Sequence, residues 1–305
     1  MFEVVGFPSE GAVLRGRLYR PRGPRKVPVV VMAHGTSATI TMVANRYAEV
    51  FIEAGLSVLL YDHRNFGDSG GEPRQELNPW IQARGYRDAV TFVESLDFTD
   101  NDAIAIWGDS YSAAQVFVVA AVDRRPAAVV AQVPALGRDF APHDPDGSLY
   151  QGLRDTLLSG EVSGEPEDKT GPLPVVSPDQ LQTPSLLTPI QAFRWFIEYG
   201  GRHGTGWENR VTRVIPRTPS PFHAGIAAPH LHQPLLMIMA PEDEMPGSNP
   251  KVSRAVYESA AGPKELFEIG GGHFGLLHYP SDLFDQAAGA QRDFLLRTLT
   301  GSHQR

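Results

Sequence analysis

The stretch Ala103-Ile-Ala-Ile-Trp-Gly-Asp-Ser-Tyr-Ser112 runs directly into Ala113-Ala-Gln-Val-Phe-Val-Val-Ala-Ala-Val122, and this junction decides the fold. The first part opens with a short apolar run of the kind that forms a strand buried on both faces. The second part is almost wholly apolar, as expected for a helix packed deep against a sheet. Gly108 lies in the sharp turn between them, where small residues are needed because the two backbones nearly touch. The junction predicts a strand, a tight turn and a helix, with Ser110 exposed at the turn.

Similar apolar runs recur on both sides of this unit, and each ends in a turn rather than continuing at a helical period. They predict strands at residues 27–33, 56–61, 127–133, 235–239 and 265–269. Apolar residues at spacings of three and four predict helices at 41–54, 82–96 and 190–199. This alternation indicates a doubly wound, mostly parallel α/β sheet, and the looser alternation of residues 1–19 predicts an antiparallel hairpin at its edge.

Residues 138–228 interrupt the alternation between two predicted core strands. The part from 141 to 189 is rich in Pro, Gly, Asp and Ser, and the helix predicted at 190–199 carries several aromatic side chains. Aromatic side chains in a long insertion need a surface to pack against, and such an insertion is typical of a lid that covers a site. We therefore expect an α/β core formed by 1–137 and 229–305, with 138–228 as an inserted cap.

Composition excludes several classes of protein. A formal net charge of -8 provides no basic surface for nucleic acid or for an anionic membrane. The count of zero cysteines excludes disulfides, thiolate metal sites and a cysteine nucleophile. Residues 1–8 do not look like a signal peptide, and no stretch approaches the roughly 20 apolar residues of a membrane span. We expect a cytoplasmic protein that binds a small molecule, without a cofactor or a metal; homo-oligomers are common on this scaffold, but no segment locates an interface.

A serine such as Ser110 becomes a nucleophile when a base removes its proton, so a histidine must lie within hydrogen-bonding reach. The chain has ten histidines, and His273 in Gly270-Gly-Gly-His-Phe274 follows the last predicted strand. Glycines there allow the loop to fold back over the strand ends. His278 is the alternative base, and a serine that only caps the helix is the alternative reading of Ser110.

The base needs an acid that orients it and stabilises the imidazolium formed during attack. Three carboxylates follow the strand at 235–239, in Ala240-Pro-Glu-Asp-Glu-Met-Pro246. We predict that Asp243 is the acid and that Glu242 and Glu244 point to solvent, the usual fate of acidic runs. The order Ser, Asp, His along the chain differs from the orders in chymotrypsin-like and subtilisin-like proteases.

Attack on a carbonyl creates an oxyanion, which requires preorganised hydrogen-bond donors. We predict that one is the backbone N–H of Tyr111, because it follows the nucleophile at a helix N-terminus where donors are unpaired. The second is predicted to be the backbone N–H of Thr36, in the turn His34-Gly35-Thr36 after the first core strand.

Two further polar segments have weaker interpretations. The turn Asp62-His-Arg-Asn-Phe-Gly-Asp-Ser69 is expected to brace the active-site loops, with a metal site made by Asp62, His63 and Asp68 as the less favoured alternative. Trp207-Glu-Asn-Arg210, near the end of the insertion, is interpreted as a hinge or a lid contact.

These residues together resemble the α/β-hydrolase superfamily, and within it the branch of dienelactone-hydrolase-like and acetyl-xylan-esterase-like serine hydrolases. The resemblance covers about residues 10–137 and 229–300. It rests on His34-Gly35, the turn at 62–69, Gly108-Asp-Ser-Tyr-Ser112, Asp243 and Gly272-His-Phe274. It implies cleavage of a carboxylic ester, a lactone or a thioester through an acyl-enzyme intermediate.

The resemblance has a narrower part and one departure. Ile106-Trp-Gly-Asp-Ser-Tyr-Ser112 and Trp207-Glu-Asn-Arg210 look like bacterial and fungal hydrolases linked to polyketide or xenobiotic metabolism. Ser112 stands where the G-x-S-x-G pattern has its second glycine, which adds a side chain at a tight packing point. A thioesterase, lactonase, peptidase or C–C hydrolase with the same triad, and a non-catalytic binding protein, remain as alternatives.

The expected pocket lies between the carboxyl ends of the strands and the insertion, where open α/β sheets place their ligands. Tyr111, Phe193, Trp195 and Phe196 suggest an apolar acyl or aromatic group, with the same residues as core of the lid being the alternative. His34 is expected either to support its loop or to line this pocket.

Overall fold

The computed structural model describes residues 1–23, 26–160 and 166–301. Its main element is an eight-stranded sheet in the order β1-β2-β4-β3-β6-β7-β10-β11. The strands are β1 (Phe2–Ser9), β2 (Ala12–Tyr19), β3 (Val27–Ala33), β4 (Ser57–Tyr61), β6 (Thr99–Asp109), β7 (Ala128–Gln132), β10 (Leu235–Met239) and β11 (Lys264–Glu268). The neighbouring strands from β4 through β3, β6, β7 and β10 to β11 pair in parallel. The antiparallel hairpin β1–β2 forms one edge, and β2 pairs antiparallel with β4. The predicted mostly parallel α/β sheet and its edge hairpin are confirmed.

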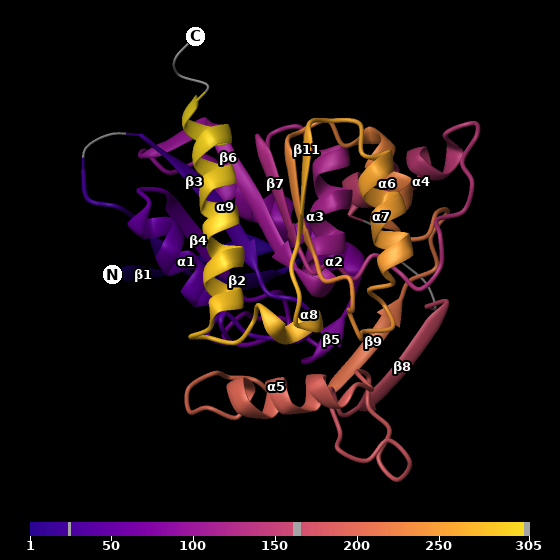
Figure 1. The fold of residues 1–305 in the computed structure, drawn as a ribbon. Helices are drawn as coiled ribbons and strands as arrows, with labels where there is room; N and C mark the ends of the chain where they lie inside the picture. Colours follow the sequence, from indigo (N-terminus) through magenta and orange to yellow (C-terminus); the bar gives the residue numbers. More distant parts are fainter. Residues whose placement is uncertain (24–25, 161–165, 302–305) are drawn as a thin grey trace.

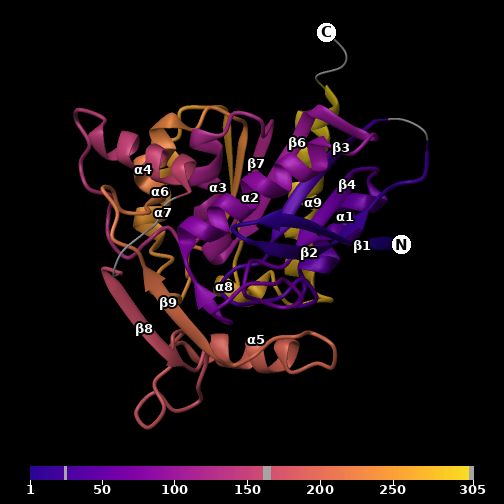
Figure 2. The same cartoon turned by 180° about the vertical axis from the view of Figure 1, so that it is seen from behind.

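Helices cover both faces of this sheet (Figures 1 and 2). One face is covered by α1 (Ala44–Glu53) and α9 (Asp282–Thr300), and the other by α2 (Pro79–Glu94), α3 (Ser110–Val122) and α7 (Pro250–Ser259). The side chains of β3 alternate between the two layers, with Val30 and Met32 in one core and Val29 and Val31 in the other. Strands buried on both faces explain the continuous apolar runs of the sequence.

The range 138–228 is built in two parts. Helix α4 (Ser148–Ser159) packs against α2 and against the short helix α6 (Ala224–Ala227), beside the α/β core. Its Leu153 and Leu157 are fully buried, and Tyr150 donates a hydrogen bond to the main-chain oxygen of Ala121. The first part of the insertion therefore widens one helical layer of the core.

The second part forms a separate layer at the end of the sheet, which we call the cap segment (166–215). It contains β8 (Asp168–Leu173), α5 (Ile190–Gly200) and β9 (Val211–Ile215), and β9 also pairs with β5 (Glu76–Leu77) of the core. Figure 1 shows α5, β8 and β9 beyond the end of the sheet at which α8 (Gly272–Gly275) lies. Because β3, β6 and β10 all run toward that end, the cap segment faces the loops that follow them.

No helix among the residues described is long and apolar enough to cross a membrane. The remaining regular element is the single 3-10 turn Ala228–His230, which follows α6 directly.

Candidate active site

The junction between β6 and α3 has the strained geometry of a nucleophile elbow. Ser110 is the first residue of α3 and has a φ of 51°, a left-handed conformation that L-residues rarely adopt. A Cβ on Gly108 would lie 2.5 Å from the main-chain oxygen of Ser112, and a Cβ on Gly35 would lie 2.7 Å from Ser110 Cβ. Both glycines are therefore required by the close approach of the backbones, and the turn presents the Ser110 hydroxyl at the end of the sheet.

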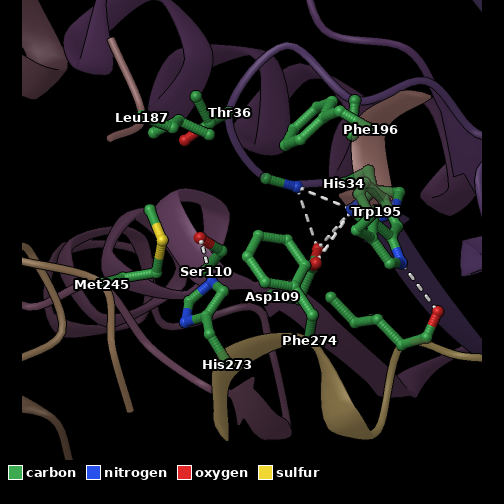
Figure 3. A pocket seen from close by; sticks show the side chains of 13 residues that line it. His34, Thr36, Asp109, Ser110, Leu187, Trp195, Phe196, Met245, His273 and Phe274 are labelled. Atoms are coloured by element: carbon green, nitrogen blue, oxygen red, sulfur yellow. Dashed lines mark hydrogen bonds and ion pairs between the residues drawn. The ribbon is translucent and has the colours of Figure 1, made fainter. Parts of the chain in front are cut away.

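The structure brings Ser110, His273 and Asp243 together from three different strand ends (Figure 3 shows the first two). His273 Nε2 lies 2.9 Å from Ser110 Oγ, and His273 Nδ1 lies 2.7 Å from Asp243 Oδ2. A carboxylate is an acceptor, so Nδ1 carries a proton and Nε2 is free to accept the proton of Ser110. The second oxygen of Asp243 accepts the N–H of Met245 at 2.9 Å, which fixes the carboxylate. The arrangement is that of a nucleophile, a base and an orienting acid.

Two main-chain N–H groups lie beside this serine without a partner. Within the described parts of the chain, the N–H groups of Thr36 and Tyr111 make no hydrogen bond. Thr36 lines the same cavity as Ser110, and Tyr111 N lies 3.1 Å from the position of a Cβ on Gly35. These are the two donors that the sequence predicts for an oxyanion.

A buried ion pair between His34 and Asp109 supports the loop that carries Thr36. His34 Nδ1 lies 2.9 Å from Asp109 Oδ1, and His34 Nε2 lies 2.7 Å from the main-chain oxygen of Met42. Asp109 Oδ1 also accepts the N–H of Gly35 at 2.9 Å. Burial alone would lower the pKa of His34, but the Asp109 carboxylate reverses this effect and raises it. His34 is thus held as a loop support and also forms part of the cavity wall.

Ser112, which replaces the expected glycine, is used as a hydrogen-bonding link. Its hydroxyl donates to the main-chain oxygen of His34 at 2.8 Å and lies 2.8 Å from His63 Nε2. Since the single hydroxyl proton goes to His34, His63 Nε2 must donate to Ser112. His63 Nδ1 is then an unprotonated nitrogen, buried without a partner among the described residues.

This arrangement predicts how His63 contributes to stability. Burial, with a smaller effect of His34, lowers the pKa of His63 to about 3, whereas an unfolded histidine has a pKa of about 6.5. Between these values the unfolded chain binds one proton more, so the free energy of unfolding falls as pH falls below 6.5. The loss between pH 7 and pH 5 should be about 2 kcal/mol larger in the wild type than in His63→Gln, which cannot titrate. Urea unfolding at the two pH values measures this difference, and equal losses would show that His63 does not titrate in this way.

The turn at 62–69 braces the loops around the site, as the sequence predicts. Asp62 Oδ1 accepts the N–H of Ile40, and Asp62 Oδ2 accepts the N–H of Asp68, at 2.9 and 3.1 Å. Burial raises the pKa of Asp62 to about 7, and the two hydrogen bonds partly oppose that rise. The described residues contain no group of three His, Cys, Asp or Glu side chains that could hold a metal ion.

The cavity above Ser110 is narrow and mostly apolar. It has a volume of about 20 Å³, and Leu187, Trp195 and Phe196 of the cap segment form part of its wall. Core residues complete the wall, and those that were not predicted as pocket residues include Ala38, Met245, Phe274 and Leu277. Figure 3 shows Trp195, Phe196 and Phe274 around the serine. Of the predicted pocket residues, His34, Trp195 and Phe196 line the cavity, whereas Phe193 packs partly buried against the core instead.

The segment Trp207-Glu-Asn-Arg210 holds the cap segment against the core loops. Trp207 lies 5.4 Å from Phe196, measured between ring centroids, and its Nε1 donates to Ser37 Oγ at 3.3 Å. Gln75 Nε2 donates to Glu208 Oε1 at 3.1 Å. These bonds join the cap segment to the core, and the role of the segment as a hinge or a lid contact stays a prediction.

The prediction that Glu242 and Glu244 point to solvent is wrong for Glu244, whereas Glu242 is exposed as predicted but still accepts a hydrogen bond from the histidine loop. Glu242 Oε1 accepts the N–H of Gly271, and Glu244 Oε2 accepts the N–H of His273, each at 2.8 Å. The sequence offers one indirect signal for these bonds. The acidic run follows β10 and the glycines follow β11, and these two strands are neighbours in the sheet.

Comparisons with known proteins agree with this architecture. The family described as "X-Pro dipeptidyl-peptidase (S15 family)" matches residues 10–152, a little less than half of the chain. "Thiohydrolase aneE" from Aspergillus aculeatus is 36% identical over 177 residues, which span 57% of this chain and 55% of that protein. "Quorum-quenching protein AidA" from Acinetobacter baumannii is 28% identical over 302 residues, or 96% of this chain and 94% of that protein.

Solved structures show the same fold over nearly the whole chain. The α/β hydrolase GrgF from Penicillium sp. sh18 is 25% identical, with a TM-score of 0.74, and the match covers 98% of this chain and 99% of that one. The elbow, the strand order and the order Ser, Asp, His along the chain all fit this relationship. The chain is therefore a member of the α/β-hydrolase superfamily.

Proposed function

We propose that the protein is a serine hydrolase that cleaves an ester-type bond through an acyl-enzyme intermediate. The observation that carries this proposal is the hydrogen-bonded chain from Ser110 through His273 to Asp243 at the wall of the cavity. A serine, a base and an acid in this geometry are the components of acyl transfer.

Each group has a role in the proposed reaction. Ser110 Oγ attacks the substrate carbonyl carbon while His273 Nε2 takes its proton, and Asp243 stabilises the imidazolium. The carbonyl oxygen becomes an oxyanion that accepts hydrogen bonds from the N–H groups of Thr36 and Tyr111. His273 then gives the proton to the leaving oxygen or sulfur, the C–O or C–S bond breaks, and the acyl group stays on Ser110. A water molecule, activated by His273, releases the acid and restores the serine.

The cavity wall favours a neutral, apolar acyl group. Its side chains are mostly apolar, and the Asp109 carboxylate is already occupied by His34 and by the N–H of Gly35. Burying a charged substrate group there without a partner would be costly. A peptidase that recognises the N-terminus of its substrate needs an acidic partner for it, and no unpaired carboxylate lines the cavity within the described residues. Esters and thioesters whose acyl chain carries no charge therefore fit the cavity better, and one relative is named a thiohydrolase.

The cavity volume adds a requirement for entry. About 20 Å³ is the space for roughly one water molecule. Because Leu187, Trp195 and Phe196 form part of the wall of this narrow cavity, we propose that the cap segment acts as a lid whose movement makes room for the acyl group.

The substrate class is tested with substrates that carry the same aryl group in the leaving group. Neutral butyryl and hexanoyl aryl esters and thioesters are compared with a succinyl half-ester and with an X-Pro arylamide. We expect kcat/KM for the neutral acyl groups to exceed that for the anionic one by about 100-fold, because the site offers the charge no partner. Ser110→Ala supplies the background rate. A preference for the arylamide or for the succinyl ester would overturn the assignment of substrate class.

A further inference from the structure

Three consecutive carboxylates after β10 bind the loop that carries His273. Glu242 accepts the N–H of Gly271 at 2.8 Å, Asp243 binds the Nδ1 of His273 at 2.7 Å, and Glu244 accepts the main-chain N–H of His273 at 2.8 Å. His273 is therefore held at two points, by its ring and by its backbone.

The sequence of the histidine loop explains why a backbone anchor is needed. Gly271 and Gly272 have φ values of 93° and 67°, and glycine loses more conformational freedom on folding than any other residue. His273 also lies in the first turn of α8, where its N–H has no intrahelical partner. A Cβ on Gly272 would lie 2.4 Å from Glu244 Oε2, so the glycine leaves the space through which Glu244 reaches the histidine.

We propose that Glu244 is a positioning residue for the base, an inference that rests on the proposed function. Asp243 sets the orientation of the imidazole ring, but a ring on a glycine-rich loop can still shift as a whole along the cavity wall. The Glu244 carboxylate opposes that shift through a charge-assisted hydrogen bond to the main chain of the same residue. Rate depends steeply on such placement, since a misplacement of about 1 Å can lower a rate by about 100-fold.

Glu244 is one of several groups near the base, so its effect must be separated from theirs. Asp243 and Ser110 bind the two ring nitrogens, and Ser248 Oγ lies 3.4 Å from Nδ1. Across the cavity, His34 and Asp109 are paired with each other. Among these groups only Glu244 binds the backbone of His273, so its removal should leave the ring contacts chemically intact.

The test compares Glu244→Ala and Glu244→Gln with Glu258→Ala, in the full chain and with a neutral aryl ester. The amide oxygen of Gln can still accept the His273 N–H, whereas Ala cannot. We expect Glu244→Ala to lower kcat by about 10- to 100-fold with KM within about twofold of wild type, and Glu244→Gln to recover most of that loss. Glu258 is an exposed residue of α7, and its carboxylate makes no hydrogen bond or ion pair among the described residues. Glu258→Ala should match the wild type.

The contrast between variants that keep and lose the hydrogen bond is a readout that loop stability alone would not give. Glu244→Asp keeps the charge, but its side chain is one methylene shorter and reaches the His273 N–H less well. It should lower kcat with KM within about twofold of wild type, and it decides the question even if Glu244→Ala does not fold. Wild-type kcat in a folded Glu244→Ala or in Glu244→Asp, or a Glu244→Gln as slow as Glu244→Ala, would refute the positioning role. If Ser110→Ala retained turnover, the proposed function would fail instead.

Discussion

Replacing Ser110 with alanine is expected to lower kcat by about 10⁶-fold without unfolding the protein. The hydroxyl is the only group within 2.9 Å of His273 Nε2 that can form a covalent acyl intermediate among the described residues. Its loss leaves hydrogen-bond donors and a base but no nucleophile, so only weak assistance to water remains. His273→Ala should reduce kcat by a similar factor, and the double variant should be no slower than either, because the residues act as one unit.

The fold of Ser110→Ala is checked by its thermal unfolding midpoint, which should not fall. Among the described residues, the Ser110 side chain makes one hydrogen bond, to His273, and alanine removes only that bond. Ser259→Ala, in an exposed position at the end of α7, is the matched control and should keep wild-type turnover. Turnover by Ser110→Ala within about tenfold of the wild type would remove the serine from the mechanism.

Replacing Asp243 with asparagine is expected to lower kcat by about 10⁴-fold. Asparagine is nearly isosteric, and the N–H of Met245 should keep the amide oxygen on its own side. The amide nitrogen then faces His273 Nδ1 and makes it an acceptor, which moves the ring proton to Nε2. A protonated Nε2 cannot take the proton of Ser110, so His273 no longer acts as a base. The fold should be retained because asparagine has nearly the same shape as aspartate.

The Asp243→Asn variant is measured by kcat with a neutral aryl ester and by its rate of labelling with a fluorophosphonate. Both should fall, because both need an activated serine. Glu258→Gln, which changes a surface carboxylate in the same way, should affect neither. A variant within about tenfold of the wild type would show that another group orients His273.

The sheet and the elbow could be predicted because their signals are local. Strands buried on both faces need continuous apolar runs, and the junction at Ser110 needs a glycine, a small residue and an apolar helix in direct succession. Strand β6 still begins earlier than predicted, at Thr99, because its first four residues are polar and Asn101 and Asp102 among them are exposed, so no apolar run marks this part.

The cap segment could not be predicted in detail because its strands lack these signals. Strand β8 reads Asp168-Lys-Thr-Gly-Pro-Leu173 and is half-buried or exposed throughout, so no apolar run marks it. Strand β9 pairs with β5, which contains only Glu76 and Leu77 and lies far away in the sequence. Pairing of this kind depends on tertiary packing rather than on local preference. Helices α4, α7 and α9 are likewise absent from the predicted elements.

The directions of loop side chains could not be predicted from the sequence, because they also depend on tertiary packing. Asp243 follows from the chemistry that His273 requires, but Glu242 and Glu244 bind main-chain groups that no pattern of residue types reveals. Phe193 and Phe196 lie on the same helix, and only the packing of α5 decides that Phe196 reaches the cavity.

The most direct test of a nucleophilic Ser110 is the intact mass of the protein after incubation with a fluorophosphonate. We predict one adduct per wild-type chain and none on Ser110→Ala under the same conditions. An adduct that persists on Ser110→Ala, or a folded wild-type protein that gains no mass, would contradict the serine-hydrolase account.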